Sequence, residues 1–242
     1  MRWLSLACAL QGALVALALT GCESSQEKSA KLEREAKLHL KQVAETEVTI
    51  TRPSTRVQAT SESVVTSSEG SAAVVMLHNS SAAALADVPI LITVRDAQGA
   101  TVYTNKAPGL THTLVSAALI PAHSVLMWID DQVQASGTAA PATASAEVGE
   151  GRPAINAIPE IVVSGAHLTE GGAEGTVTNR SAVAQRELVI NAIARRAGRV
   201  LAAGRAVLPS LPGAGSLHFQ VFLIGSLTGA QLQVSAPATT PG

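Results

Sequence analysis

Cysteine, aromatic residues and charge are all scarce in this chain of 242 residues. Its two cysteines, Cys8 and Cys22, both lie near the N-terminus, so the remaining sequence can form no disulfide scaffold and offers no thiol nucleophile. Beyond residue 22 the aromatic side chains are Tyr103, Trp128, Phe219 and Phe222. This small number argues against a sugar- or peptide-binding cleft built on aromatic platforms. The formal net charge of -1 provides no basic field that would attract nucleic acid.

The N-terminal segment has the pattern of an export signal. Arg2 precedes an uncharged, largely apolar run over residues 4–19, which suits the hydrophobic region of a secretory signal peptide and is too short to span a bilayer. The run ends in Leu19, Thr20, Gly21 and Cys22. This ending resembles the bacterial lipobox, in which small residues precede a cysteine that is lipid-modified before cleavage. The alternative is an ordinary signal peptide that a cysteine happens to follow.

The lipobox resemblance implies that residues 1–21 are a lipoprotein signal peptide and that Cys22 becomes the acylated N-terminus. Acyl chains contribute about 0.8 kcal/mol per buried methylene, so two or more of them anchor a protein stably. We therefore expect a lipid anchor on the extracytoplasmic face of a bacterial cell membrane. Whether that membrane is the inner or the outer one is left open.

Residues 22–47 differ in composition from the rest of the chain. The stretch 31–43 is rich in helix formers, and its apolar residues recur at helical spacing. We expect the lipidated N-terminus to continue into a helical stalk, which would extend roughly 35 Å at 1.5 Å per residue. A coiled-coil partner helix is the alternative, although only about three heptads are present.

From residue 48 onward the pattern is that of β-structure. Short runs rich in Thr, Val and Ile are separated by Gly, Pro, Ser and Asn at intervals of roughly 8–12 residues, which is typical of an all-β sandwich or barrel. In the predicted strand 88–96, Ile90, Ile92 and Val94 share one face, which we expect to be buried. The segment 97–99 then predicts a turn.

The β-pattern occurs twice along the chain. Asn79-Ser80-Ser81 is matched by Asn179-Arg180-Ser181, the strand 88–96 by the segment 188–193, and Pro121 with Trp128 by Pro212 with Phe219. The offset between the copies falls from 100 residues at the asparagines to 91 at the aromatic residues, so the first copy contains a longer loop near 104–118. This internal duplication predicts a first β-sandwich over 48–150 and a second over 153–236, followed by a disordered tail over 237–242.

Each copy has the length of an immunoglobulin-like sandwich. An Asn-x-Ser after a strand, an alternating strand, a glycine turn and a Pro/Gly turn before an aromatic-bearing strand together resemble the FxLYD family of bacterial envelope modules. Residues 92–96 keep the hydrophobic spacing and the Asp of that family's naming motif without its Phe and Tyr, and residues 191–195 lack the Asp as well. The resemblance implies two tandem immunoglobulin-like β-sandwiches, and it implies no activity.

Three groups of polar residues are candidate sites. Asn79 and Asn179 fit the N-glycosylation acceptor pattern, but asparagine also suits the turn that ends a strand, and we favour the turn. The pair Asp130-Asp131 has no calcium-loop spacing, so we expect a solvated strand end. The six histidines form no metal-ligand motif, although His78, His112 and His123 belong to one copy and could meet in space. No Gly-x-Ser-x-Gly elbow or phosphate loop occurs.

Two apolar features complete the expectations. Trp128 and Phe219 occupy matching positions and are predicted to be core residues. The run 221–224 is the best candidate for an exposed docking strand, with a buried inner strand as the alternative.

These observations predict no catalytic residue, cofactor or metal site. We expect a non-catalytic binding or scaffolding module with an envelope protein as its partner. The alternative is an accessory protein that binds a small ligand or metal ion through His78, His112, His123 or the Asp130 region.

Overall fold

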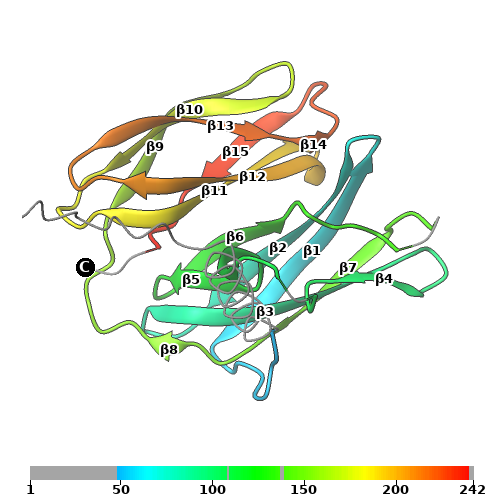
Figure 1. Cartoon of the computed structure of the whole chain (residues 1–242), viewed down its shortest axis with the longest axis horizontal. Helices are drawn as coiled ribbons and strands as arrows, with labels where there is room; N and C mark the ends of the chain where they lie inside the picture. Colours follow the sequence, from blue (N-terminus) through cyan, green and yellow to red (C-terminus); the bar gives the residue numbers. More distant parts are fainter. Residues whose placement is uncertain (1–47, 108, 137–138, 240–242) are drawn as a thin grey trace, which may run out of the picture. The chain divides into compact units, whose positions relative to one another are not determined.

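The computed structural model describes residues 48–107, 109–136 and 139–239, and these residues form strands arranged in antiparallel sheets (Figure 1). The predicted signal peptide, the lipobox residues Leu19, Thr20 and Gly21, the lipidation site Cys22 and the predicted stalk lie outside the described residues. Within the described part, no helix has the length and apolar character needed to cross a membrane. The all-β prediction is confirmed.

The first half of the described chain, residues 48–154, contains two facing sheets. One sheet has the order β1-β2-β6, and the other is centred on β3, which pairs with β4, β5, β7 and β8. The strand bounds are β1 (Val57–Ser67), β2 (Gly70–Asn79), β3 (Leu85–Arg95), β4 (Thr101–Thr104), β5 (Ser116–Ile120), β6 (Ser124–Asp130), β7 (Thr143–Val148) and β8 (Arg152–Pro153). A short 3-10 helix, η1 (His112–Leu114), precedes β5.

The second half, residues 161–239, has a closely similar strand order. One sheet has the order β9-β10-β13 and the other β14-β12-β11-β15. The bounds are β9 (Ile161–Leu168), β10 (Gly172–Asn179), β11 (Gln185–Arg196), β12 (Arg199–Leu211), β13 (Ser216–Phe222), β14 (Ile224–Gly225) and β15 (Gln231–Ser235). In Figure 1 this half occupies the upper part of the molecule and the first half the lower part.

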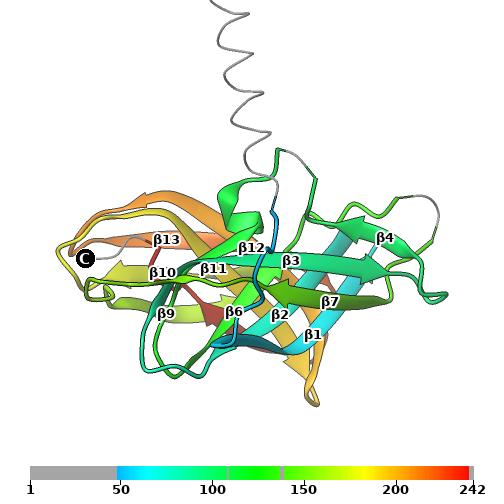
Figure 2. The same cartoon turned by 90° about the horizontal axis from the view of Figure 1, so that it is seen from below.

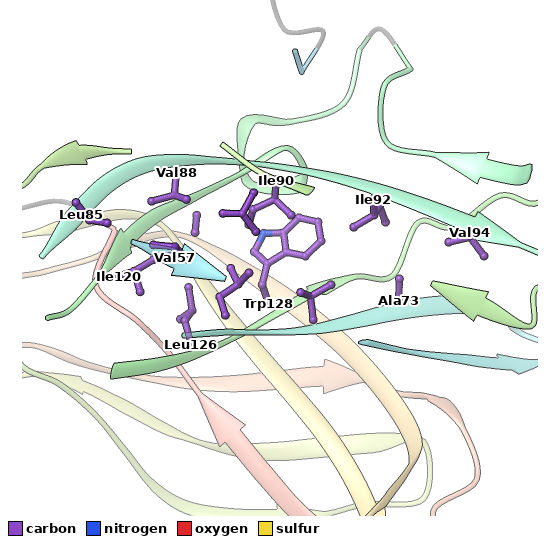
Figure 3. Packing of buried hydrophobic residues seen from close by; sticks show 14 of the residues in the cluster. Val57, Ala73, Leu85, Val88, Ile90, Ile92, Val94, Ile120, Leu126 and Trp128 are labelled. Carbon is purple, nitrogen blue, oxygen red and sulfur yellow. The ribbon is translucent and has the colours of Figure 1, made fainter. Parts of the chain in front are cut away.

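Each half buries its own apolar core. In the first half, Ile90, Ile92 and Val94 of β3 face Trp128 of β6, whose ring points between the two sheets (Figure 3). Phe219 of β13 lies in the core of the second half. Both predictions, the buried face of 88–96 and the core position of the two aromatic residues, are confirmed. The period-two alternation of a half-buried strand explains why the sequence revealed this face.

A third apolar cluster joins the two halves. It contains side chains from β1, β2 and β6 of the first half and from β11, β12 and β14 of the second, namely Val65, Ala72, Val74, Met127, Ile129, Ile193, Ala203 and Ile224. The approach is close at Gly225, where an added Cβ would lie 2.7 Å from Cγ1 of Val65. Two sheets that each turn one face to their own core therefore use their other faces to bind each other.

The edge of β3 is interrupted between β4 and β5. The side chain of Asn105 lies in this gap: its Oδ1 accepts the Ile92 N–H at 2.8 Å, and its Nδ2 donates to the carbonyls of Ile90 and Leu114 at 2.9 and 2.8 Å. A side-chain amide thus makes the hydrogen bonds that a peptide group of an unbroken neighbouring strand would make. The longer loop expected near 104–118 is this segment.

The ends of the two halves are also defined by backbone hydrogen bonds. β8 pairs with β3, and the Ala154 N–H donates to the Ala84 carbonyl at 2.8 Å, so the first half continues slightly past the predicted boundary at 150. The predicted disordered tail is packed as far as it is described. Ala238 is buried, and Thr239 donates its N–H to Oε1 of Gln185 at 2.9 Å.

Candidate functional site

Arg205 of β12 is the centre of a buried polar cluster at the junction of the two halves. Its Nη1 donates to the Thr113 carbonyl at 2.9 Å, and its Nη2 donates to the Thr113 hydroxyl at 2.6 Å. Its backbone N–H donates to Oδ2 of Asp131 at 3.2 Å. Thr113 lies in η1 and Asp131 follows β6, so one residue of the second half is held by two separate segments of the first.

Asp130 lies beside this cluster and is fully buried. The Tyr103 hydroxyl donates to its Oδ2 at 2.8 Å, and the Gln132 N–H donates to its Oδ1 at 2.8 Å. The expectation of a solvated strand end is therefore wrong for Asp130. The reason is that Tyr103, which comes from β4, supplies a donor that lets the carboxyl group be buried.

The junction carries ionisable groups in an unfavourable environment. Burial raises the pKa of Asp130, an effect that the hydrogen bonds from Gln132 and Tyr103 oppose. Burial also raises the pKa of Asp131, whereas the Arg205 guanidinium counteracts this rise, and burial lowers the pKa of Arg205. Burial and the nearby Asp130 carboxylate raise the pKa of Tyr103. The desolvation cost is offset by mutual contacts, so the loss of any partner is expected to be costly.

The structure also brings together Asp87, His112 and Ser116, a combination that the sequence did not single out. Ser116 Oγ lies 2.8 Å from Nε2 of His112, and Oδ1 of Asp87 lies 3.7 Å from the same nitrogen. In a catalytic triad the carboxylate binds Nδ1 and leaves Nε2 free to accept the serine proton. Ser116 Oγ moreover lies 3.0 Å from the His112 carbonyl, to which it can donate its proton. This geometry does not activate the serine.

The remaining predicted polar sites are structural. Asn79 and Asn179 are both fully buried, and each accepts hydrogen bonds on Oδ1 from the N–H and hydroxyl groups of the serine two residues later. The turn interpretation is confirmed, because the asparagines bridge backbone groups of the adjoining loops. Among the described residues, no three His, Cys, Asp or Glu side chains are grouped in a way that could hold a metal ion. The histidines proposed for the accessory-protein alternative therefore form no such group.

The docking-strand prediction over 221–224 is largely wrong. Val221 and Leu223 are buried in the core of the second half, and Ile224 is buried at the junction. Phe222 alone of this run is exposed, at 57 %. The inner-strand alternative is the better description, because the run alternates between a core face and the outside before it turns toward the first half.

A small cavity lies between β5, β6, β11 and the C-terminal segment. Its volume is about 30 Å³, and its lining includes Trp128, Leu119, Val189 and Asn191. The Oδ1 atom of the buried Asn191 has no hydrogen-bond partner among the described residues. A volume of this size suits one or two water molecules, whereas pockets for small organic ligands are about 300–1,000 Å³.

No known protein-family model matches the chain, and no curated protein matches its sequence.

Proposed function

We propose that the protein is a lipid-anchored, extracytoplasmic component of a bacterial envelope, in which two tandem immunoglobulin-like, FxLYD-like domains act as a non-catalytic binding or scaffolding module. The observation that carries this proposal is the way in which the halves are joined. The space between them, where a two-domain enzyme or ligand carrier would have its cleft, is filled by apolar side chains and by the Arg205 contacts. The cavity that lies beside Trp128 and Asn191 at this junction has room for water and not for an organic ligand.

Internal duplication is supported by backbone conformations that recur at the predicted offsets. Asp87 and Glu187 both have positive φ, at 49° and 47°, and interrupt matching strands 100 residues apart. His123 and Ala214, at 50° and 51°, are 91 residues apart. Positive φ is uncommon for residues other than glycine, so two such pairs favour two copies of one domain.

Lipid anchoring is supported by the sequence of residues 1–22 alone. A lipid anchor suits a binding or scaffolding module, because such a module would act by holding its partner near the membrane. The partner is expected to be another envelope protein.

Acyl labelling with in-cell crosslinking tests both parts of the proposal. Cells expressing the full chain would be labelled with a fatty-acid analogue and crosslinked, and partners would be identified by mass spectrometry. We expect wild type and Cys8→Ala to carry the label, and Cys22→Ala to lose both the label and the membrane location. One dominant envelope partner, lost with Cys22→Ala, would support a tethered module.

Other outcomes would overturn parts of this account. Label retained in Cys22→Ala would contradict the anchor. Labelled protein without a reproducible envelope partner would contradict the binding or scaffolding role. Cys8→Ala is the matched control, because Cys8 lies within the predicted signal peptide and should not be the acylated residue.

A further inference from the structure

The tip of the β11–β12 hairpin concentrates positive charge. Arg195, Arg196 and Arg199 lie within five residues, and Arg196 is the direct cross-strand partner of Arg199. Like charges in directly opposite positions destabilise a hairpin. None of the ion pairs formed within the described residues involves these three arginines. The hairpin tip therefore carries three positive charges that form no ion pair within the described chain.

A hollow of about 330 Å³ adjoins the tip. Its lining includes Arg195, Arg196 and Gln231. The Nε atom of Arg195 is buried and has no hydrogen-bond partner among the described residues, which leaves a donor unpaired at this site. Nη1 of Arg196 donates to the Thr228 carbonyl at 3.2 Å, and this contact fixes the guanidinium at the edge of the hollow. The gold hairpin also extends past its neighbouring strands at the bottom of Figure 2, so a ligand can reach it.

The corresponding hairpin of the first half shows that this charge is not needed for the turn. There Arg95 is followed by Asp96, whose Oδ1 accepts the N–H groups of Gln98 and Ala100 at 3.0 and 2.8 Å. One arginine and one carboxylate balance at that tip. The tip in the second half has three arginines and no carboxylate. Its turn is instead closed by Ala197 and Gly198, both with positive φ.

We propose that the β11–β12 hairpin binds a phosphate group through Arg195 and Arg196, which line the hollow, with Arg199 adding charge as the cross-strand partner of Arg196. A phosphate presents several acceptor oxygens, which match the fork geometry of guanidinium groups and their multiple donors. Binding would bring negative charge to the opposed pair Arg196 and Arg199 and screen their repulsion. A soluble phosphate ester and a phospholipid headgroup share this chemistry. The inference does not depend on the lipid anchor or on the envelope role.

The test is a calorimetric titration of the full-length chain in nonionic detergent at constant ionic strength. The probes are inorganic phosphate, glycerophosphoglycerol and phosphatidylglycerol in mixed micelles with the same detergent, and the variant is Arg196→Gln with Arg199→Gln. Both residues are exposed, so the fold should tolerate the change, which circular dichroism would verify. Arg95→Gln in the corresponding hairpin of the first half is the matched control.

We expect saturable binding of at least one probe, weakened about tenfold or more in the double variant because charged hydrogen bonds are lost, and unchanged in Arg95→Gln. Binding of the two soluble probes would identify a free phosphate or phosphate ester as the ligand. Arginine-dependent binding of the phosphatidylglycerol mixed micelles alone would identify a lipid headgroup. Equal affinity of wild type and double variant for every probe, or no saturable binding of any probe, would overturn the proposal.

Discussion

The two halves of the chain treat the edge of their central strand differently. In the second half, β12 pairs with β11 along nearly its whole length. In the first half, the same edge is divided between β4 and β5, and the side chain of Asn105 replaces the missing backbone partner. The interruption produces η1, and η1 supplies Thr113 to Arg205. The loop that breaks the regularity of one half therefore forms the polar contact that locks it to the other.

A second difference lies inside the cores. Tyr103 pairs across the strands with Val94, as Ala202 does with Ala194, and Asp130 corresponds by its offset of 91 to Val221. One half thus buries a hydroxyl–carboxylate pair where the other buries two apolar side chains. The comparison shows that the fold does not require the polar pair. The desolvation cost of that pair occurs in the first half, whose residues Thr113 and Asp131 contact Arg205.

The largest expected effect is that of Arg205→Ala. The change removes two hydrogen bonds that the charged guanidinium donates to Thr113 and the positive charge that opposes the raised pKa of the partly buried Asp131, so the free energy of unfolding should fall by about 3 kcal/mol or more. Chemical denaturation of the full chain measures this value. Arg199→Ala, an exposed arginine on the same strand, should change it by less than about 0.5 kcal/mol. Equal effects would show that Arg205 is not a junction contact.

Asn105→Ala should have the next largest effect. It removes the partners of the Ile92 N–H and of the Ile90 and Leu114 carbonyls, and unpaired buried polar groups cost about 1–3 kcal/mol each. We expect a total loss of about 3 kcal/mol in denaturant unfolding, the lower end of that sum, together with faster amide exchange at Ile92. Unchanged exchange at that amide would contradict the view that the side chain substitutes for a strand.

Local periodicity revealed a large part of this fold and little of the junction. The alternation of Ile90, Ile92 and Val94 identified a core face, because each residue's environment depends on its own strand. The burial of Asp130 depends on Tyr103, 27 residues away, and Arg205 meets a residue 92 positions away. No pattern within either segment encodes the other, so these contacts were not predictable from one sequence.

Replacing the Tyr103–Asp130 pair by apolar side chains makes the first core apolar at these positions, as the second core is. Tyr103→Phe alone should cost about 1–2 kcal/mol, because Asp130 loses a donor while it stays buried. Adding Asp130→Val should recover that loss, since replacing a buried polar pair by apolar side chains is often neutral or stabilising. A double-mutant cycle on unfolding free energies gives the coupling. A double variant less stable than the sum of the singles would mean that the polar pair has a further structural role.

The smallest expected effect is a pH dependence. The pKa of Asp130 is raised in the folded state, so the folded protein binds its proton more tightly than the unfolded chain. Its contribution to stability is complete below the ordinary aspartate value and is lost as the pH rises through the folded pKa. Relative to Asp130→Asn, the wild type should therefore gain stability as the pH falls from 7 toward about 4. A difference that is constant with pH would contradict the raised pKa.

The most direct test of the account is differential scanning calorimetry of the full chain and of Arg205→Ala. If the apolar cluster and Arg205 unite the halves into one body, the wild type should unfold in one transition whose calorimetric and van't Hoff enthalpies agree. Arg205→Ala should lower the Tm and separate the transition into two. Two independent transitions in the wild type, unaffected by the substitution, would contradict the joined scaffold on which the proposed function is built.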